Sequence, residues 1–460
     1  MSNWASVRIL LLHPPVNYYM PPEYMVEPLG IEYIASTLRR DGHEVEIFDA
    51  HLQCLNLRQV IRELENREFD CLGISATAEL RHALIAIARA VRKRRKDAII
   101  AAGGYLPTLS AEQLLAACPE LDFVVRGEGE QIARDVFGHI ACGEEWHDAP
   151  GIGSLKGKTP ILNPVPPLIQ DLDALPFPSR EGLMQAKVPT SAAVTTSRGC
   201  YHRCSFCAIQ SFYAVSAQRV PRFRSAENVV NEVESVIAEV GTRRFRFIDD
   251  DFMGPGPKIR ERVIRIAEEI RSRKLGITFS IECRCDEVDE DLLKLLKEVG
   301  LTDVFLGVES GVQRQLDTYN KRVTVEQNKR AIETVRRLGF RFRAGFMMFD
   351  PYLTMAELEE NMRFIREMGL EQQAKEASVP FVTKMIIHKG VPLYEKLRED
   401  GLLREKGLEV DYVFKDPLIR LMGRVALASS AVSTFFRRLL GLLKLGRRGQ
   451  TGVRKHSDPE

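Results

Sequence analysis

Hydrophobic positions follow two alternating spacings along the first third of the chain. Short apolar runs, typical of buried strands, occur at 7–12, 44–48, 71–75, 98–102 and 123–125. Between them, apolar residues three or four positions apart predict helices at 31–40, 57–65, 81–95 and 111–117. This alternation predicts a doubly wound parallel sheet, a flavodoxin-like α/β domain, over residues 1–143.

The same alternation resumes after a proline-rich segment, 144–190, which we expect to be an extended linker because prolines exclude a long helix. Strands are expected at 192–194, 245–248, 278–282, 303–308, 341–348 and 378–383. Helices are expected at 226–240, 258–273, 290–299, 324–338 and 355–368. Six such strand–helix units predict a (β/α)6 partial barrel over 191–403, with functional groups at the carboxyl ends of its strands.

The barrel pattern fades beyond residue 403. We expect 404–460 to be a helical, basic extension with a disordered end. Its segment 418–448 is both apolar and basic. Such a stretch either lies on an anionic membrane surface or packs against the barrel as a lid. We prefer packing, which is the more common outcome.

The composition reduces the number of protein classes to which the chain could belong. The 460 residues are 45% hydrophobic and 28% charged, with a formal net charge of +2, which predicts an ordinary enzyme without a large nucleic-acid footprint. No basic-plus-apolar leader and no uncharged apolar stretch of membrane-spanning length occurs. Six of the nine cysteines are scattered without metal-site spacing, so we expect reduced thiols and a cytoplasmic location.

The most specific motif is a group of three cysteines, Cys200, Cys204 and Cys207, with the spacing C-x3-C-x2-C. Three thiolates on one loop can hold three irons of a cubane cluster and leave the fourth iron open, whereas electron-carrier clusters usually have four cysteine ligands. A structural zinc site needs four ligands. His202 could be the fourth, but no second cysteine pair follows at zinc-finger spacing, so zinc is disfavoured and a disulfide more so.

This loop resembles the cluster loop of the radical S-adenosylmethionine (radical SAM) superfamily, including the aromatic residue Phe206 before the third cysteine. The resemblance implies a [4Fe–4S] cluster whose open iron binds the amine and carboxylate of S-adenosylmethionine.

Polar residues stand where the barrel strands are expected to end. Among the three adjacent carboxylates at 249–251, repulsion requires at least one to face water or a cation, such as the amine of methionine. Arg284 suits the cofactor carboxylate, because a guanidinium pairs with it bidentately. By resemblance to the family, Glu309 lies at the ribose, and the run Asn320-Lys321-Arg322 also fits. The candidate SAM-binding residues are Phe206, Asp250, Glu282, Arg284, Glu309 and Ser310.

The loops after the N-terminal strands carry prolines, hydroxyls and paired glycines. The first loop lacks the G-x-G-x-x-G of a nicotinamide site. Paired glycines let a backbone approach a ligand closely. Together these loops resemble the cobalamin-binding domain that precedes many radical SAM enzymes. The resemblance implies cobalamin contacts at Pro14, Ser75, Thr77, Gly103, Gly104, Thr108, Gly127 and Glu128.

One departure concerns the cobalt ligand. The D-x-H-x-x-G loop of the well-known cobalamin methyltransferases is absent after the first strand; Asp49-Ala50-His51 follows the second strand, with Cys54 in place of the glycine. We therefore expect no histidine on cobalt, with His13 as the remaining alternative.

The sequence thus predicts a cobalamin-dependent radical SAM enzyme. It would cleave S-adenosylmethionine to a deoxyadenosyl radical, abstract hydrogen from an unactivated carbon and methylate that carbon through methylcobalamin. The alternative is a non-methylating oxidoreductase or cyclase of the same architecture, like the anaerobic magnesium-protoporphyrin ester cyclases. A cobalamin-binding sensor is a further alternative from another class. Expected partners are a small-molecule or peptide substrate and an electron donor of the flavodoxin or ferredoxin type.

Overall fold

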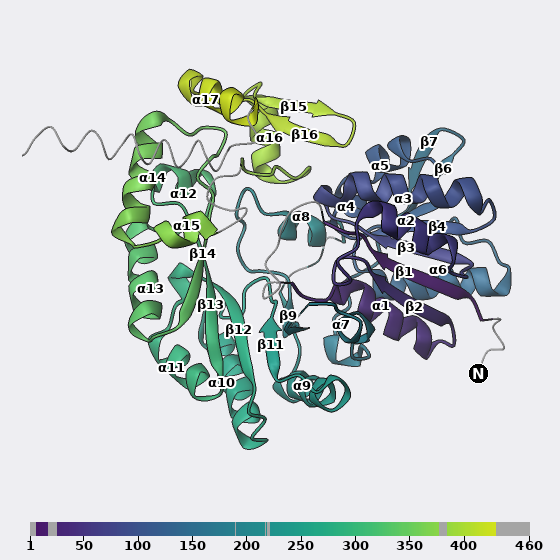
Figure 1. Ribbon diagram of the computed structural model, residues 1–460, viewed down its shortest axis with the longest axis horizontal. Helices are drawn as coiled ribbons and strands as arrows, with labels where there is room; N and C mark the ends of the chain where they lie inside the picture. The colour runs from purple at the N-terminus through teal and green to yellow at the C-terminus, as the bar shows by residue number, and fades with distance from the viewer. Residues whose placement is uncertain are drawn as a thin grey trace, which may run out of the picture.

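The computed structural model describes residues 6–16, 25–188, 190–216, 218, 221–376 and 384–428. Two α/β units lie side by side, with residues 392–428 above the second unit (Figure 1). No helix within the described residues is long and apolar enough to cross a membrane. Most of the basic segment predicted at 418–448, and the predicted disordered end, fall outside the described residues.

The N-terminal unit is built on a sheet of order β2-β1-β3-β4-β5-β6-β7. Its first five strands are parallel, as expected from their alternation with helices. Because the chain order reverses between β1 and β3, loops at their carboxyl ends diverge and leave room for a ligand. These strands are β1 (Arg8–His13), β2 (Glu44–Asp49), β3 (Cys71–Ser75), β4 (Ile99–Gly103) and β5 (Phe123–Val125).

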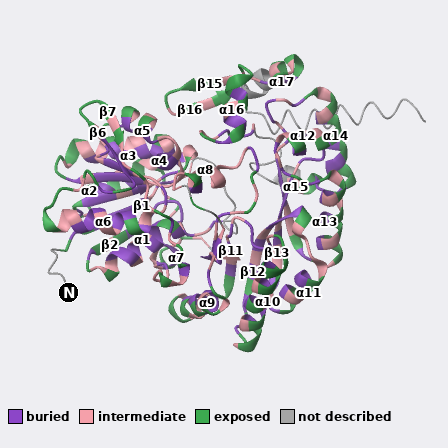
Figure 2. Cartoon of the chain, turned by 180° about the vertical axis from the view of Figure 1, so that it is seen from behind, coloured by how far each residue is buried: buried purple, intermediate pink, exposed green. Residues whose placement is uncertain are grey.

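Helices cover both faces of this sheet. On one face, α1 (Leu29–Arg40) and α6 (Gly129–Cys142) bury apolar residues against the strands. The other face is covered by α2 (Leu57–Glu65), α3 (Arg81–Arg94), α4 (Tyr105–Leu109) and α5 (Ala111–Ala117). Buried positions accordingly concentrate on the strands and on the inward sides of the helices (Figure 2).

The linker contains a hairpin that sequence reasoning missed. Strands β6 (Ile152–Lys156) and β7 (Thr159–Leu162) pair antiparallel and extend the N-terminal sheet beyond β5. Gly157 makes the turn at φ +66°, and Pro160 is tolerated because β7 is the edge strand. The short helix α7 (Glu181–Met184) follows farther along.

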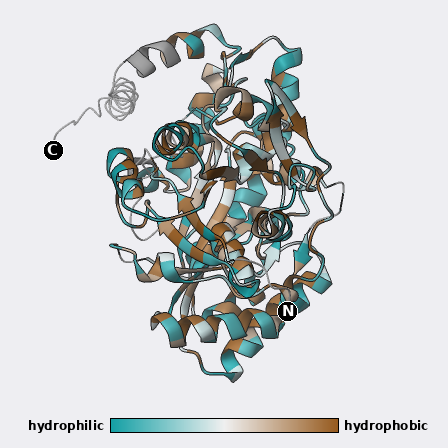
Figure 3. Ribbon diagram, turned by 90° about the vertical axis from the view of Figure 1, so that its right-hand side faces the viewer, coloured by the Kyte–Doolittle hydropathy of each residue, from teal (hydrophilic) through white to brown (hydrophobic). Residues whose placement is uncertain are grey.

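The second unit is an open barrel with five parallel strands in the order β14-β13-β12-β11-β8. The sixth strand, predicted at 378–383, lies outside the described residues. The strands are β8 (Ala192–Val194), β11 (Arg244–Phe247), β12 (Thr278–Arg284), β13 (Leu301–Glu309) and β14 (Arg341–Phe346). The outer helices are α9 (Ala226–Val240), α10 (Pro257–Ser272), α11 (Glu290–Glu298), α13 (Val325–Arg337) and α14 (Met355–Glu367). These helices bury hydrophobic residues against the strands. Hydrophobic and hydrophilic positions alternate along the helices of the chain (Figure 3).

The chain after the barrel is not wholly helical. A hairpin of β15 (Leu403–Lys406) and β16 (Glu409–Tyr412) separates α16 (Pro392–Glu399) from α17 (Pro417–Ala428). This segment packs on the barrel: the Tyr412 hydroxyl donates to the Phe349 carbonyl at 2.9 Å. The Leu393 amide donates to the Ser205 carbonyl at 2.8 Å, so α16 touches the cysteine loop.

Candidate active site between the two units

The cysteine loop follows β8 and a two-residue strand, β9 (Ser197–Arg198), and leads into α8 (Ala208–Ala214). Two carboxylates just after β11 accept hydrogen bonds from the backbone at the start of the cysteine loop. Asp249 accepts from the Thr196 amide at 3.0 Å, and Asp250 accepts from the Gly199 amide at 2.9 Å. On the opposite side, the Ser205 amide donates to the Tyr319 carbonyl at 2.8 Å. The loop shape is therefore imposed by neighbouring strand ends.

The three predicted ligand thiols share this loop but do not converge on one ion. Within the described residues, the only group of His, Cys, Asp or Glu whose ligand atoms lie within 4.8 Å of one another is His202, Asp251 and Glu287. Thiolates on one tetrahedral zinc would lie about 3.8 Å apart, given Zn–S bonds of about 2.3 Å. The three thiols are therefore not arranged around a single ion.

Burial raises the pKa of Cys200 to about 12, with Asp251 adding to the effect, and burial likewise raises the pKa of Cys207 to about 12. Metal coordination offsets such a cost, because a bound cation stabilises the thiolate. Cys204 already has a cation beside it, since Arg284 Nη1 lies 3.6 Å from its sulfur.

The three adjacent carboxylates have separate environments. Asp249 is fully buried and holds the loop entry. Asp250 lines the cavity described below, and burial raises its pKa to about 7. Asp251 lies with one oxygen 4.0 Å from the Cys200 sulfur and 3.7 Å from His202 Nε2.

The rim of β12 and β13 carries paired charges. Glu309, at φ +63°, accepts from the buried Lys321 at 2.9 Å. A Cβ on Gly307 would lie 2.8 Å from Lys321 Nζ, so a glycine is needed there for this pair. Arg284 is held bidentately by Asp286 at 2.9 and 3.0 Å. Glu309 and Arg284, the candidate cofactor partners, are thus held in position by these ion pairs.

Three other residues predicted at the SAM site have different contacts. Glu282 accepts from Arg246 at 2.8 Å on the inner side of the barrel strands. Ser310 is fully buried and donates to Gln315 at 2.6 Å. Phe206 meets Tyr319 edge to face at 5.5 Å. Their contact with the cofactor stays a prediction.

A cavity of about 450 Å³ runs from inside the N-terminal unit to the barrel rim. Its inner part is lined by residues of two apolar clusters, one shared by α1 and α6 and one between α6 and strands β4 and β5, and by strand residues with small side chains. Its mouth is lined by barrel residues that include Asp250 and Ser197. Inner lining residues that sequence reasoning missed are Leu11, Gly73, Ala101, Phe123, Ala133 and Phe137.

The glycines at the end of β4 shape this cavity. Gly104 has φ +103°, and a Cβ there would lie 2.9 Å from the Ala76 carbonyl oxygen. Only glycine therefore permits this close approach of two strand-end loops. Of the predicted cobalamin contacts, the lining includes Ser75, Gly103, Gly104, Gly127 and Glu128.

The other predicted cobalamin contacts are not among the described lining residues. Thr108 accepts from the Gly127 amide at 3.1 Å and so holds the loop after β5. His13 lies 3.1 Å from Asp49. Pro14 and Thr77 follow β1 and β3 without reaching the cavity wall. Their role toward cobalamin stays a prediction, as does a cobalt without histidine.

Aromatic side chains from both units meet at the cavity mouth. Tyr105 of α4 and Phe212 of α8 lie 4.7 Å apart between ring centroids, and Tyr213 lines the same mouth. Sequence reasoning missed these residues, since nothing in the local pattern shows that α4 and α8 are neighbours.

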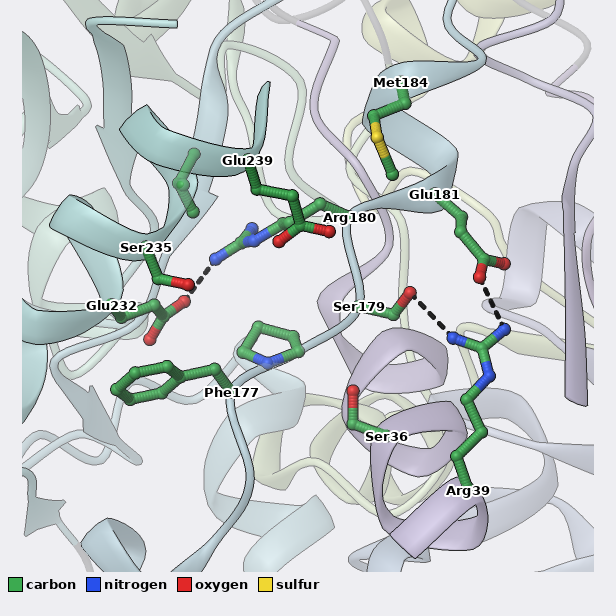
Figure 4. Close-up of a pocket in the computed structure, with 12 residues that line it drawn as sticks. Ser36, Arg39, Phe177, Ser179, Arg180, Glu181, Met184, Glu232, Ser235 and Glu239 are labelled. Carbon is green, nitrogen blue, oxygen red and sulfur yellow. Dashed lines mark hydrogen bonds and ion pairs between the residues drawn. The ribbon is translucent and has the colours of Figure 1, made fainter. Parts of the chain in front are cut away.

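Buried ion pairs join the two units. Glu128 accepts from Arg222 at 2.8 Å and from Arg198 at 3.1 Å. Burial tends to raise the pKa of Glu128, but the two arginines outweigh it, and the pKa lies below its usual value. Arg180, in the linker, contacts Glu232 of α9 (Figure 4), and it also contacts Glu27 before α1. All three of these side chains are nearly inaccessible to solvent.

Comparison with known families agrees with this architecture. The B12 binding domain family matches residues 21–137, and the radical SAM superfamily matches residues 194–365. This chain is a cobalamin-binding radical SAM enzyme. The enzyme's implied groups fit the residues present: three thiols for a [4Fe–4S] cluster with one open iron, and a glycine-shaped cavity for cobalamin.

Several relatives span most of the enzyme. An uncharacterized methyltransferase of Pyrococcus horikoshii is 28% identical over 90% of this chain and 88% of its own. The anaerobic magnesium-protoporphyrin IX monomethyl ester cyclase of Rubrivivax gelatinosus is 29% identical over 78% of this chain and 66% of its own. The hopanoid C-3 methylase of Methylococcus capsulatus is 30% identical over 72% of this chain and 63% of its own.

Solved structures share the fold. The cobalamin-dependent radical SAM enzyme OxsB, solved with aqua-cobalamin and S-adenosylmethionine, superposes with a TM-score of 0.72 at 22% identity, over 89% of this chain and 65% of its own. The methyltransferase TsrM from Kitasatospora setae superposes with a TM-score of 0.68 at 17% identity, over 89% of this chain and 80% of its own.

Proposed function

We propose that the enzyme methylates an unactivated carbon of a small-molecule or peptide substrate, with cobalamin as the methyl carrier. The observation that carries this proposal is the shared cavity. Its inner part is enclosed by the N-terminal unit, and its mouth is lined by Asp250 and Ser197 beside the cysteine loop. A carbon held at this mouth would face both cofactor sites at once.

When bound, the reduced cluster and S-adenosylmethionine would supply a radical that removes a hydrogen atom, and cobalamin would supply the methyl group. The chain's residues provide position and exclude water. Cys200, Cys204 and Cys207 would hold the cluster. Glu309 would accept hydrogen bonds from the ribose hydroxyls, and Arg284 would face the cofactor carboxylate.

The relatives support methylation in two ways. The Pyrococcus protein, which covers nearly the whole enzyme, is named a methyltransferase, and the Methylococcus relative is named a methylase. The Rubrivivax relative is named a cyclase, which keeps ring formation or oxidation as the second candidate. We further propose an electron donor of the flavodoxin or ferredoxin type, because the cluster must be reduced for each cleavage.

Trideuteromethyl-labelled S-adenosylmethionine tests the proposal. The anaerobically reconstituted enzyme, loaded with cobalamin and dithionite, should form both deoxyadenosine and S-adenosylhomocysteine, with label transferred to the corrinoid. Deoxyadenosine without S-adenosylhomocysteine would support the ring-forming alternative. If neither product forms, the proposal is wrong. The Cys200→Ala/Cys204→Ala/Cys207→Ala variant should make no deoxyadenosine and hold no cluster iron.

A further inference from the structure

The cysteine loop exposes a small basic surface at its outer side. Tyr201 is 42% exposed, and Arg203, between the first two cysteines, is exposed as well. Arg322 is exposed on the neighbouring loop after α12 (Gln313–Thr318). We call Tyr201, Arg203 and Arg322 the cluster-loop patch. Cys204 directly follows Arg203 and is 9% exposed, so this predicted cluster ligand lies close to the patch.

A hydrogen bond links the two loops that carry these arginines. Asn320 donates from its side-chain amide to the Arg203 carbonyl at 2.7 Å. Asn320 and Arg322 both have left-handed backbones, at φ +48° and φ +57°, which residues with side chains adopt uncommonly. This turn directs the intervening Lys321 inward to Glu309 and leaves Arg322 outside.

The positive charge of the patch is not neutralised nearby. Neighbouring basic residues have carboxylate partners: Arg260 with Asp289, Arg284 with Asp286, and Lys321 with Glu309. By contrast, no ion pair of Arg203 or Arg322 with a carboxylate is found in the part of the chain that the structure describes. Arg322 instead faces the side-chain oxygen of Asn320 at 3.4 Å.

Other sides of the cysteine loop are covered. Helix α16 contacts it through the Leu393–Ser205 hydrogen bond, and α8 follows it and packs against Tyr105 of the N-terminal unit. A protein that delivers electrons must bring its redox group close to the cluster, because electron transfer slows steeply with distance. The cluster-loop patch offers such an approach.

We propose that the cluster-loop patch is the docking surface for an acidic electron-transfer protein. This inference rests on the proposed electron donor and assigns its binding site. Redox partners form small, transient interfaces, and complementary charge mainly accelerates their encounter. Two arginines without a carboxylate partner suit the acidic surface of such a donor, and the exposed Tyr201 of the same cysteine loop would add contact area.

Charge reversal with two electron sources tests the docking surface. Deoxyadenosine formation by the cluster-loaded Arg203→Glu/Arg322→Glu variant should be measured with a bacterial flavodoxin and its NADPH-dependent reductase, and separately with saturating dithionite plus methyl viologen. We expect kcat/KM for flavodoxin to fall at least tenfold, because electrostatic steering changes association rates by 10- to 1,000-fold. The rate with the chemical reductant should stay within about twofold of the parent's.

A matched variant controls for net charge. Arg58→Glu/Arg62→Glu reverses two exposed arginines of α2 on the N-terminal unit, which gives the same change in net charge, and should leave the flavodoxin rate unchanged. Added NaCl should slow the parent with flavodoxin and have little effect on the double variant, because salt screens charge. An Arg203→Lys/Arg322→Lys variant should retain most of the rate.

The outcomes separate the two proposals. If the charge-reversed variant keeps the parent's flavodoxin kinetics, the docking surface is wrong. If it loses the same factor with both electron sources, the arginines serve the cluster and not a partner, which also overturns the proposal. If flavodoxin fails to support even the parent while the chemical reductant succeeds, the proposed donor type is wrong, and the docking surface with it.

Discussion

Carboxyl groups in this enzyme differ chiefly in whether a cation lies beside them. Glu128 is buried between two arginines, and its pKa lies below the usual value. Its contribution to folding is therefore present at neutral pH and is lost only as the pH falls through that lowered pKa. Glu32 is fully buried, and both of its oxygens are without a hydrogen-bond partner among the described residues.

Glu32 gives a pH-dependent prediction. Burial, with nearby Glu27, raises its pKa well above the usual value, so the folded state keeps a proton that the unfolded chain releases above about pH 4.3. Folding stability from this group therefore falls as pH rises, until the raised pKa is passed. Glu32→Gln cannot lose a proton, so its advantage over the parent should grow from pH 5 to pH 8, by at most about 1.4 kcal/mol per pH unit.

Urea unfolding at both pH values measures this difference. Glu181→Gln changes a partly exposed carboxylate of α7 and is the control. Its effect on the free energy of unfolding should depend little on pH. An advantage of Glu32→Gln that shrinks toward pH 8 would contradict the assignment.

Glu309 gives a second prediction at the residue scale. Glu309→Gln keeps the size of the side chain but removes the charge that faces Lys321. Losing one charged partner in a desolvated site costs about 2–5 kcal/mol. We expect normal iron content and S-adenosylmethionine binding weakened at least tenfold, measured by calorimetric titration. Glu290→Gln, on an exposed helix position, should bind like the parent; equal affinities in all three proteins would show that the ribose lies elsewhere.

At the scale of elements, the space between α1, α6 and the sheet decides what the N-terminal unit can bind. A doubly wound sheet normally fills this space with large side chains. Here Gly73 on β3 and Ala101 on β4 have small side chains, which leave space between the sheet and the helices. The apolar core on that face is divided into two clusters. The cavity lies between them.

Filling this cavity should block corrinoid binding without unfolding the sheet. Ala101→Leu adds a branched side chain on the cavity wall, where space already exists. We expect cobalamin affinity to fall at least tenfold, by absorbance titration of the full chain, while the thermal midpoint changes by only a few degrees. Ala90→Leu makes the same change in a separate groove between α2 and α3 and should bind normally. Normal binding by Ala101→Leu would contradict this placement.

At the scale of the whole molecule, Arg180 joins three parts of the chain. It contacts Glu27 before α1 and Glu232 on α9, and it donates to the Ala193 carbonyl of β8 at 2.8 Å. Ala193 in turn donates its amide to Glu27 at 3.0 Å. Because the cavity is lined from both units, their relative placement determines the distance between the two cofactor sites.

Replacing Arg180 should uncouple the two units. Arg180→Met leaves the buried Glu27 without its cation, whereas Glu232 keeps Arg224, and breaking such a buried pair costs about 3–5 kcal/mol. We expect calorimetry to show two unfolding transitions where the parent shows one. Arg180→Lys should give an intermediate result, because an ammonium cannot match the geometry of a guanidinium. Arg39→Met removes the partly exposed ion pair between Arg39 and Glu181 (Figure 4). This variant should keep a single unfolding transition.

Much of this architecture was determined by local sequence. The strand and helix periodicities predicted both α/β units, since each element buries one face regardless of its distant neighbours. The three cysteines were recognisable because all of them lie on one short loop. The hairpin at 152–162 was missed, because prolines near an edge strand resemble those of a linker. The contacts predicted for Pro14, Thr77 and Ser310 rested on position along the chain, which does not determine which way a side chain points, and they stay predictions.

Only the tertiary structure decided which distant residues meet. Arg180 lies 153 residues from Glu27 and 52 from Glu232, and no local pattern marks such a triad. The cavity depends on small residues from separate strands and on aromatic residues from both units, so it exists only once the sheet, α1, α6 and the barrel have packed. Periodicity reports which face of an element is buried. The partners of that face are set by packing between elements, and in this enzyme that packing brings the two cofactor sites together.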